Sequence, residues 1–247
     1  MAELTFFNGI QTILFDLDGT LRYSLPSGDR VMMDYAVQLG APDSPENRRR
    51  TARWVHYYWA QSPELMLDLE RYPDMGEPFW VNYARRKLQI FDCPAEWIEE
   101  LAAKIQRYMA EQYQPDDHIP EYIYQVLAAL RSAGYRLGLV TNRTYPIDDY
   151  LKTTGLAEYF QSVVVAGQVG AWKPDPAIFQ PALKALGSLP SQTLYVGDNF
   201  YADIQGARAA GIQPVLLDPD EIFDDCGCHT IQTIEQLTSL VTLPGNF

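Results

Sequence analysis

The architecture follows from the segment Ile13-Leu14-Phe15-Asp16-Leu17-Asp18-Gly19-Thr20-Leu21, in which a short apolar run leads into two aspartates and a glycine. Residues i and i+2 of a strand share a face, so Asp16 and Asp18 start on one side of the chain. Gly19 permits a sharp bend directly after them. Two adjacent anions repel, so a site built from them requires a cation or a proton. An Asp-Gly pair after a strand is also a common turn, and this segment alone does not separate the two interpretations.

Four further apolar runs share the composition of the first: each is short, rich in Val, Leu and Ile, and without clean alternation. The five runs cover residues 12–15, 137–140, 163–166, 193–196 and 214–217. Strands that are buried on both faces of a parallel sheet have this composition. Helical patterns lie between the later runs, at 119–133, 147–154, 176–186 and 202–210. This alternation predicts an α/β fold with a doubly wound, Rossmann-like parallel sheet.

A long helical insertion follows the first strand. After Leu21 no strand pattern appears until about Arg136, and helical patterns occupy 44–60, 77–89 and 95–112. We therefore expect two domains. Residues 1–22 and 115–247 form a catalytic core, and residues 23–114 form an inserted helical cap domain, with the return linker starting at Gln114-Pro115.

Polar residues follow the predicted strands at the edge where an open parallel sheet binds ligands. They are Asp16, Asp18, Thr141, Asn142 and Asp198, together with Lys173 in the loop after the run 163–166. Three acids, a lysine and a hydroxyl at one edge suit magnesium-assisted phosphoryl transfer, because Mg²⁺ is a hard cation that prefers oxygen ligands.

Four motifs in this set resemble those of the haloacid dehalogenase superfamily. In chain order they are Asp16-Leu17-Asp18-Gly19-Thr20, Thr141-Asn142, Lys173-Pro174, and Gly197-Asp198 with Asp203. The resemblance covers about residues 10–22 and 116–240. The helical insertion lies where this family places its type-1 cap.

The resemblance implies a catalytic role for each matching residue. Asp16 would be the nucleophile and would form an aspartyl-phosphate. Asp18 would protonate the leaving oxygen and then deprotonate the attacking water. Thr141, together with Asn142, would bind the phosphoryl group, and Lys173 would offset the negative charge of that group.

The resemblance also implies Mg²⁺ as the cofactor, bound by the carboxylates of Asp16 and Asp198 and by the backbone carbonyl of Asp18. Asp203 would be a further metal ligand or a carboxylate that supports the others. Its place near the start of a helical pattern also suits an N-cap, and capping does not exclude a metal role.

The acid at position 18 limits which reactions of the family we expect for this chain. Family members that resemble dehalogenases or phosphonatases lack an acid at this second position, so its presence favours a phosphatase acting on a small soluble phosphomonoester. A β-phosphoglucomutase-like phosphotransferase is the first alternative, because mutases share both aspartates. A non-catalytic binding module on the same fold is the second alternative. Such a module is expected to have lost Asp16, Asp18 or Lys173, and the chain retains all three.

Several residues are candidates for contact with the rest of the substrate. Arg22 and Tyr23 directly follow the aspartate motif, and Arg143 follows Asn142. The insertion is rich in arginine and aromatic residues, but their helical spacing is more typical of core positions and solvated faces. The aromatic residues expected in the core are Trp54, Tyr57, Tyr58 and Trp80.

Composition limits the partners and the compartment. The net charge of −13 argues against non-specific binding to nucleic acid or anionic membranes. No apolar run approaches the roughly 20 residues that span a bilayer, and residues 1–8 show no secretory signal. The three cysteines, Cys93, Cys226 and Cys228, predict neither a disulfide framework nor a zinc site. We expect a cytoplasmic enzyme with a small phosphorylated substrate.

Overall fold

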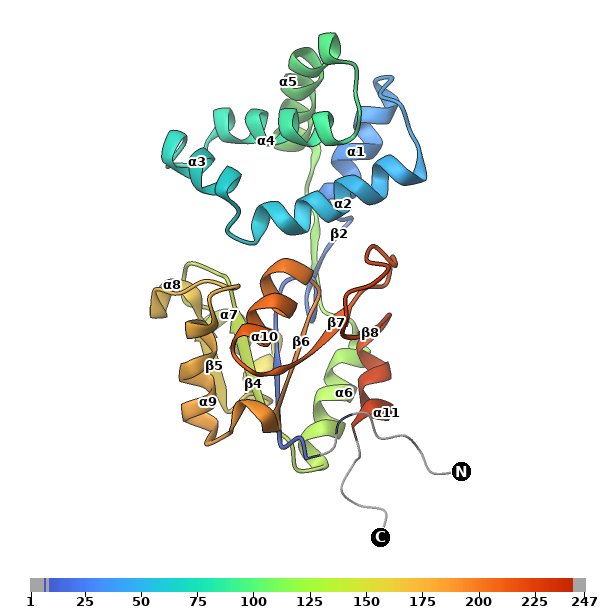
Figure 1. Ribbon diagram of the computed structural model, residues 1–247. Helices are drawn as coiled ribbons and strands as arrows, with labels where there is room; N and C mark the ends of the chain where they lie inside the picture. The colour runs from blue at the N-terminus through green and yellow to red at the C-terminus, as the bar shows by residue number, and fades with distance from the viewer. Residues whose placement is uncertain (1–6, 8, 242–247) are drawn as a thin grey trace. The chain divides into compact units, whose positions relative to one another are not determined.

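The computed structural model describes residue 7 and residues 9–241, and the chain divides into two compact units (Figure 1). The larger unit holds the described residues up to Arg22 and those from Ile119 onward, and the smaller unit is Tyr23–His118. The expectation of no strand between Leu21 and about Arg136 is wrong, because β2 (Tyr23–Leu25) and β3 (Asp116–His118) pair antiparallel. Both strands are three residues long and lack the buried apolar run that identifies a strand in the sequence. Their pairing places the segment before Ile119 in the smaller unit.

The larger unit is built on a parallel sheet, and its described residues form six strands in the order β5-β4-β1-β6-β7-β8. The strands are β1 (Thr12–Phe15), β4 (Arg136–Thr141), β5 (Ser162–Val165), β6 (Thr193–Gly197), β7 (Gln213–Leu217) and β8 (His229–Ile231). Five of them correspond to the predicted apolar runs. The sixth, β8, lies at the sheet edge and has three residues, too few to produce a sequence pattern.

Helices cover both faces of this sheet. They are α6 (Glu121–Ser132), α7 (Asp148–Thr154), α8 (Ala166–Val169), α9 (Gln180–Leu186), α10 (Gln205–Ala209) and α11 (Leu237–Leu240). Alternate residues of β1 point to opposite faces: Ile13 packs in one core cluster with Leu127 of α6, and Leu14 packs in another with Leu183 of α9. The predicted doubly wound α/β core is confirmed.

One predicted helix of the larger unit has an irregular start. The pattern 202–210 divides into the π-helical turn η4 (Phe200–Ile204) and α10. Asn199 is the N-cap of η4, and its side-chain oxygen accepts hydrogen bonds from the backbone of Tyr201 and Ala202, each at 3.0 Å. Single π-helical turns often occur at functional sites, and η4 carries Asp203.

The smaller unit is helical. Its helices are α1 (Gly28–Gln38), α2 (Pro45–Trp59), α3 (Pro63–Arg71), α4 (Glu77–Ile90) and α5 (Ala95–Gln112). Tyr58 and Phe79 are fully buried in its core, but the placement of Trp80 there is wrong, since 38% of its surface is exposed. Across residue 7 and residues 9–241, none of the helices combines the length and the apolar character needed to traverse a bilayer.

Candidate active site

Three strands of the parallel sheet end at one edge and present motif residues there. β1 pairs in parallel with β4 on one side and with β6 on the other. Asp16 directly follows β1, Thr141 is the last residue of β4, and Asp198 directly follows β6. The backbone N–H of Asp16 donates to the carbonyl oxygen of Val196 at 2.9 Å, so the nucleophile candidate is still held by the sheet ladder.

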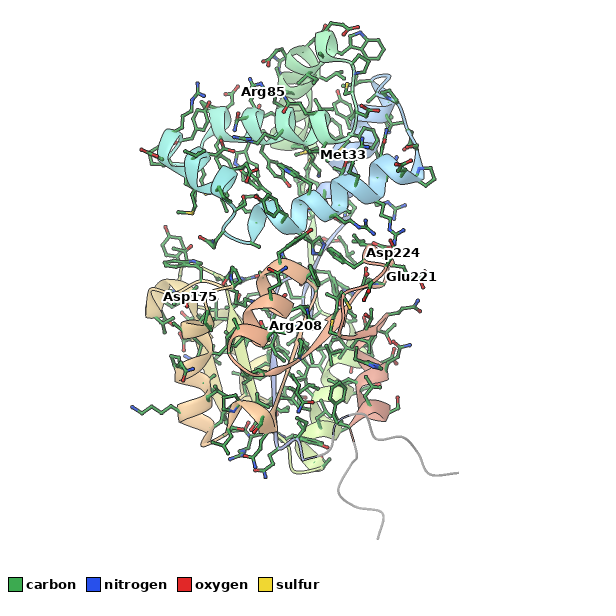
Figure 2. The ribbon with its side chains drawn as sticks, in the orientation of Figure 1. Met33, Arg85, Asp175, Arg208, Glu221 and Asp224 are labelled. Carbon is green, nitrogen blue, oxygen red and sulfur yellow. The ribbon has the colours of Figure 1, made fainter. Side chains whose placement is uncertain are left out.

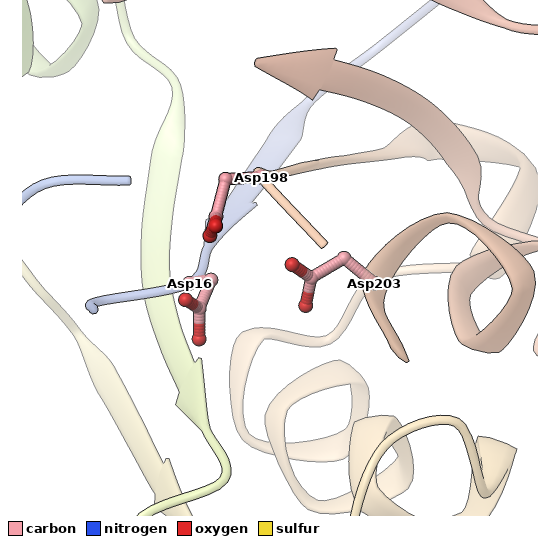
Figure 3. A group of neighbouring side chains, drawn as sticks. All are labelled: Asp16, Asp198 and Asp203. Carbon is pink, nitrogen blue, oxygen red and sulfur yellow. The ribbon is translucent and has the colours of Figure 1, made fainter. Parts of the chain in front are cut away.

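The carboxylates of Asp16, Asp198 and Asp203 form a compact group, which we call the carboxylate cluster. Each offers one oxygen, and these oxygens all lie within 4.8 Å of one another. Figure 3 shows the three side chains converging from different segments of the chain. The Asp18 side chain does not belong to this group. The carboxylate cluster thus brings together three of the four predicted metal ligands through their side chains.

Lys173 supplies the positive charge inside this cluster. Its Nζ lies 2.6 Å from Asp16 Oδ1 and 2.7 Å from Asp203 Oδ1, and it also donates to the Tyr195 hydroxyl at 2.8 Å. Lys173 is only 2% exposed, so the three contacts satisfy the three donors of a buried ammonium. This arrangement fixes the Asp16 carboxylate in one orientation.

Burial and mutual repulsion perturb the carboxylates. Burial is the largest effect on Asp16, and the charges of Asp203 and Asp18 add to it, so its pKa rises to about 7 although Lys173 opposes the rise. Burial, followed by the charges of Asp203 and Asp16, also raises the pKa of Asp198 well above 3.8. One lysine therefore does not compensate three clustered acids, of which Asp16 and Asp203 are buried and Asp198 is half-buried, and a divalent cation would relieve the remaining repulsion. The donor set consists of carboxylate oxygens, which fits Mg²⁺.

Gly19 allows Asp198 to approach the aspartate motif. Its φ is +89°, in the region that favours glycine, and a Cβ at this position would lie 2.5 Å from Asp198 Oδ2. The neighbouring Thr20 donates its hydroxyl to Asp198 Oδ1 at 3.1 Å. The Asp-Gly turn is therefore part of the site: it orients Asp198.

Asp18 is held by arginines at the margin of the site. Arg143 donates through Nε and Nη2 to the two carboxylate oxygens of Asp18, both at 2.7 Å, and Arg22 Nη1 adds a contact at 3.3 Å. The Asp18 side chain remains 39% exposed. Arg22 and Arg143 were candidates for substrate contact, and the structure brings both to the proposed general acid. Tyr23, the third candidate, lies in the smaller unit.

Thr141 and Asn142 occupy different positions in the site. Thr141 is 1% exposed, and its Oγ1 accepts a hydrogen bond from the backbone of Arg143 at 3.3 Å. The Asn142 side chain makes two hydrogen bonds with the backbone of Lys173. Its Oδ1 accepts from the Lys173 N–H at 2.7 Å, and its Nδ2 donates to the Lys173 carbonyl oxygen at 3.0 Å. The Asn142 side chain thus holds the loop that positions Lys173, and phosphate binding by this residue stays a prediction.

Asp203 supports both the helix start and the carboxylate cluster, but the prediction that it is the N-cap is wrong, because Asn199 holds that position. Its Oδ2 accepts a hydrogen bond from the backbone N–H of Asn199, the N-cap of η4, at 2.9 Å. Its Oδ1 binds Lys173 within the carboxylate cluster. The helix start and the cluster therefore depend on the same side chain.

Sequence reasoning missed Tyr195, which lies in the middle of β6. Its hydroxyl accepts from Lys173 and lies 3.2 Å from Asp203 Oδ1 and 3.0 Å from the carbonyl oxygen of Val140. Nothing in the apolar run around this tyrosine indicates a polar contact, because the contact depends on which side chains lie on that face of the sheet.

Comparison with known proteins establishes the family. The sequence model of the haloacid dehalogenase-like hydrolases matches residues 10–211. This match spans most of the chain, and the chain belongs to that family, as the four motifs predict. It is an enzyme of the hydrolase class.

Among its relatives are characterised phosphatases. The chain is 30% identical over 233 residues to the phosphoserine phosphatase of Thermus thermophilus, covering 85% of this chain and 89% of the relative. It is 31% identical over 241 residues to the phosphoglycolate phosphatase of Salmonella typhimurium, covering 87% and 89%. A crystal structure of a HAD phosphatase from Thermococcus onnurineus superposes with a TM-score of 0.52 at 25% identity, covering 95% of this chain and 99% of that one. The prediction of a phosphate-ester hydrolase of this family is confirmed.

Proposed function

We propose that this enzyme is a Mg²⁺-dependent phosphatase that hydrolyses a small soluble phosphomonoester through an aspartyl-phosphate on Asp16. The observation that carries the proposal is the carboxylate cluster, with Lys173 Nζ at 2.6 Å from Asp16 Oδ1 and a more exposed acid, Asp18, two residues further along the chain. The phosphatase relatives support the reaction class. We assign catalysis to the larger unit and the role of a cap to the smaller unit.

In the first step a carboxylate oxygen of Asp16 attacks phosphorus, and the bond between phosphorus and the leaving oxygen breaks. Asp18 gives its proton to that oxygen, so the alcohol departs neutral. The products are the alcohol and a phosphoryl group on Asp16. The contact with Lys173 keeps the attacking carboxylate in a fixed orientation during this step.

In the second step Asp18, now ionised, accepts a proton from water. The resulting nucleophile attacks phosphorus, releases inorganic phosphate and restores the Asp16 carboxylate. Asp18 ends the cycle protonated, ready for the next leaving group.

Charge stabilisation completes the site. Asp16, Asp198 and the backbone carbonyl of Asp18 would hold Mg²⁺, with Asp203 beside them. The ion would supply charge neutralisation for the phosphoryl oxygens. Lys173 contributes a fixed positive charge, and Thr141 is positioned at the end of β4 to donate its hydroxyl to a phosphoryl oxygen.

The test is release of inorganic phosphate from p-nitrophenyl phosphate and from a panel of phosphorylated metabolites. We expect turnover with Mg²⁺, loss of turnover in EDTA, and recovery when Mg²⁺ is added back. Asp16→Asn should lose several orders of magnitude in rate while keeping its circular dichroism spectrum. Asp149→Asn is the matched control, because Asp149 is a fully exposed aspartate whose ion pair lies with Lys152 on α7. Full activity after exhaustive chelation, or in Asp16→Asn, would refute the proposal.

The same assay separates a hydrolase from a phosphotransferase. A hydrolase releases one phosphate for each substrate consumed, whereas a mutase converts a sugar phosphate into an isomer and releases little phosphate. We expect release to equal consumption. A sugar-phosphate isomer as the main product would assign the enzyme to the mutases.

A further inference from the structure

Two cysteines in the loop between β7 and β8 lie in direct contact. The Sγ atoms of Cys226 and Cys228 are 2.9 Å apart. A disulfide bond is about 2.05 Å long. Two thiolates on one tetrahedral zinc ion, with Zn–S bonds of about 2.3 Å, lie about 3.8 Å apart. The observed Sγ–Sγ distance is shorter than that of two zinc-bound thiolates. Only a small movement of the two sulfurs is needed to form a disulfide.

The loop is built to produce this contact. In an extended chain the side chains of residues i and i+2 share a face, but their attachment points are about 6.6 Å apart. Gly227 has a φ of +60°, a turn conformation open to glycine, and this reversal brings the flanking sulfurs together. The carboxylate of Asp218 anchors the start of the loop by accepting from the backbone of Ile222 at 2.8 Å and of Phe223 at 2.9 Å.

A second anchor fixes Cys226 itself. Arg208 of α10, labelled in Figure 2, donates through Nη2 to the Cys226 carbonyl oxygen at 2.6 Å. The Cys226 side chain packs with Ile204 of η4 and Leu216 of β7, and Cys226 is only 7% exposed. The position of Sγ is therefore set by the protein core.

The two thiols are chemically unequal. Burial raises the pKa of the Cys226 thiol, but hydrogen bonds from Cys228 and Thr230 outweigh burial and hold it below its ordinary value of 9.0. The Thr230 hydroxyl lies 3.2 Å from Cys226 Sγ. Burial, together with the hydrogen bond and charge of Cys226, raises the pKa of Cys228 to about 12. The thiolate is the nucleophile in disulfide exchange, but an external disulfide must also reach it. Cys226 is buried and Cys228 is half-buried, so access favours Cys228 while acidity favours Cys226, and the serine variants decide which thiol attacks first.

We propose that Cys226 and Cys228 form a reversible dithiol–disulfide site whose oxidant is a low-molecular-weight disulfide of the glutathione class. The thiolate of one cysteine attacks one sulfur of the small disulfide and expels one thiolate, which gives a mixed disulfide. The other cysteine then loses its proton, attacks the protein sulfur of the mixed disulfide and expels the second thiolate. The two protein thiols are oxidised and the small disulfide is reduced to two thiols. In a reducing compartment the two cysteines remain thiols, and in an oxidising compartment they form the disulfide. This proposal does not depend on the phosphatase activity.

The test treats the folded full-length protein with oxidised glutathione, then alkylates it in denaturant and maps the peptides by mass spectrometry. We expect the wild type to lose two of its three alkylatable thiols, with the peptide that contains both cysteines lighter by two hydrogens. Dithiothreitol should restore them. Cys93 is buried in the smaller unit, and its retention as a free thiol reports that the chain stayed folded. Cys93→Ser is the matched control and should form the same cross-link.

Two variants trap the intermediate. Cys226→Ser and Cys228→Ser each lack one nucleophile, so the variant that keeps the first attacking thiol should accumulate glutathione on it, and dithiothreitol should remove it. The proposal is overturned if the wild type keeps all three thiols in excess oxidised glutathione, or ends with stable glutathione adducts in place of the cross-link. Absence of a glutathione adduct from both variants would overturn it as well.

Discussion

In the proposed mechanism Asp18 delivers and accepts a proton, and its environment differs from that of Asp16. Asp16 is buried against Lys173, whereas Asp18 is partly exposed and bound by Arg143 and Arg22. Two carboxylates of the same motif thus have environments that suit two different roles. The proposed nucleophile is fixed inside the protein, and the side chain of the proposed acid is partly exposed.

Asp18 should matter most when the leaving group is poor. An alkoxide from a sugar phosphate needs a proton, and p-nitrophenolate hardly needs one. A general acid contributes about 10²–10⁴-fold, so Asp18→Asn should slow enzyme phosphorylation by an alkyl phosphate by this factor and by far less for p-nitrophenyl phosphate. The measurement is the pre-steady-state phosphorylation rate of both proteins with both substrates. Equal losses for the two substrates would rule against Asp18 as the acid.

Arg143 should position Asp18. Its guanidinium binds both oxygens of the carboxylate, a geometry that methionine cannot replace and lysine replaces only in part. We expect kcat to fall about 10²-fold in Arg143→Met and less in Arg143→Lys, because misplaced catalytic groups cost about this much. Arg131→Met is the control, since Arg131 is an exposed arginine of α6. Wild-type kinetics in Arg143→Met would contradict the role.

Among the secondary-structure elements, those with clear apolar patterns could be predicted from the sequence. Short strands and helices with interrupted patterns could not. Composition and spacing predict the strands β1, β4, β5, β6 and β7 and the helices α2, α4, α5, α6 and α7. Helices α1 and α3 begin at the N-caps Ser27 and Ser62, but proline and glycine nearby weaken their patterns. The motif residues of the site could also be predicted. The contacts of Tyr195 and the pairing of Arg143 with Asp18 could not, because they join segments distant in the chain.

Helices α1 and α4 of the smaller unit are joined by a buried lysine. Lys87 is 1% exposed, and its Nζ lies 2.5 Å from Asp29 Oδ1 and 3.2 Å from the Asp29 carbonyl oxygen. Burial tends to raise the pKa of Asp29, but the charge and hydrogen bond of Lys87, with a hydrogen bond from Tyr83, hold it below 3.8. The Asp29 side chain is 48% exposed, so water screens the pair and reduces its contribution.

Asp29→Asn should lower the free energy of unfolding by about 2 kcal/mol at neutral pH, since it leaves a buried ammonium without its carboxylate. Because the folded state lowers the Asp29 pKa, this stabilisation exists above 3.8 and is lost as the pH falls through the folded pKa. Urea unfolding of both proteins at neutral pH and at successive values below 3.8 measures the difference. A difference that stays constant or grows on acidification would contradict the assignment.

For the whole molecule, the residues to which we assign catalysis all lie in the larger unit. The carboxylate cluster, Lys173, Asp18 and both of its arginines come from residues up to Arg22 or beyond Ile119. The smaller unit has its own core, formed by residues of α1, α2, α3, α4 and α5. We therefore expect substitutions in the smaller unit to alter which phosphate ester is accepted while the phosphoryl chemistry at Asp16 persists.

The central claim is that Asp16 carries the phosphoryl group, and acid quenching during turnover tests it most directly. The enzyme is mixed with p-nitrophenyl phosphate and Mg²⁺, quenched in acid within the first turnovers, and its peptides are mapped by mass spectrometry. We predict one phosphoryl group on the peptide containing Asp16, more of it in Asp18→Asn, and none in Asp16→Asn. The claim that Asp16 carries the phosphoryl group would be contradicted by two results together. The wild type would turn over with no phosphoryl adduct in the wild type or in Asp18→Asn, and Asp16→Asn would retain activity.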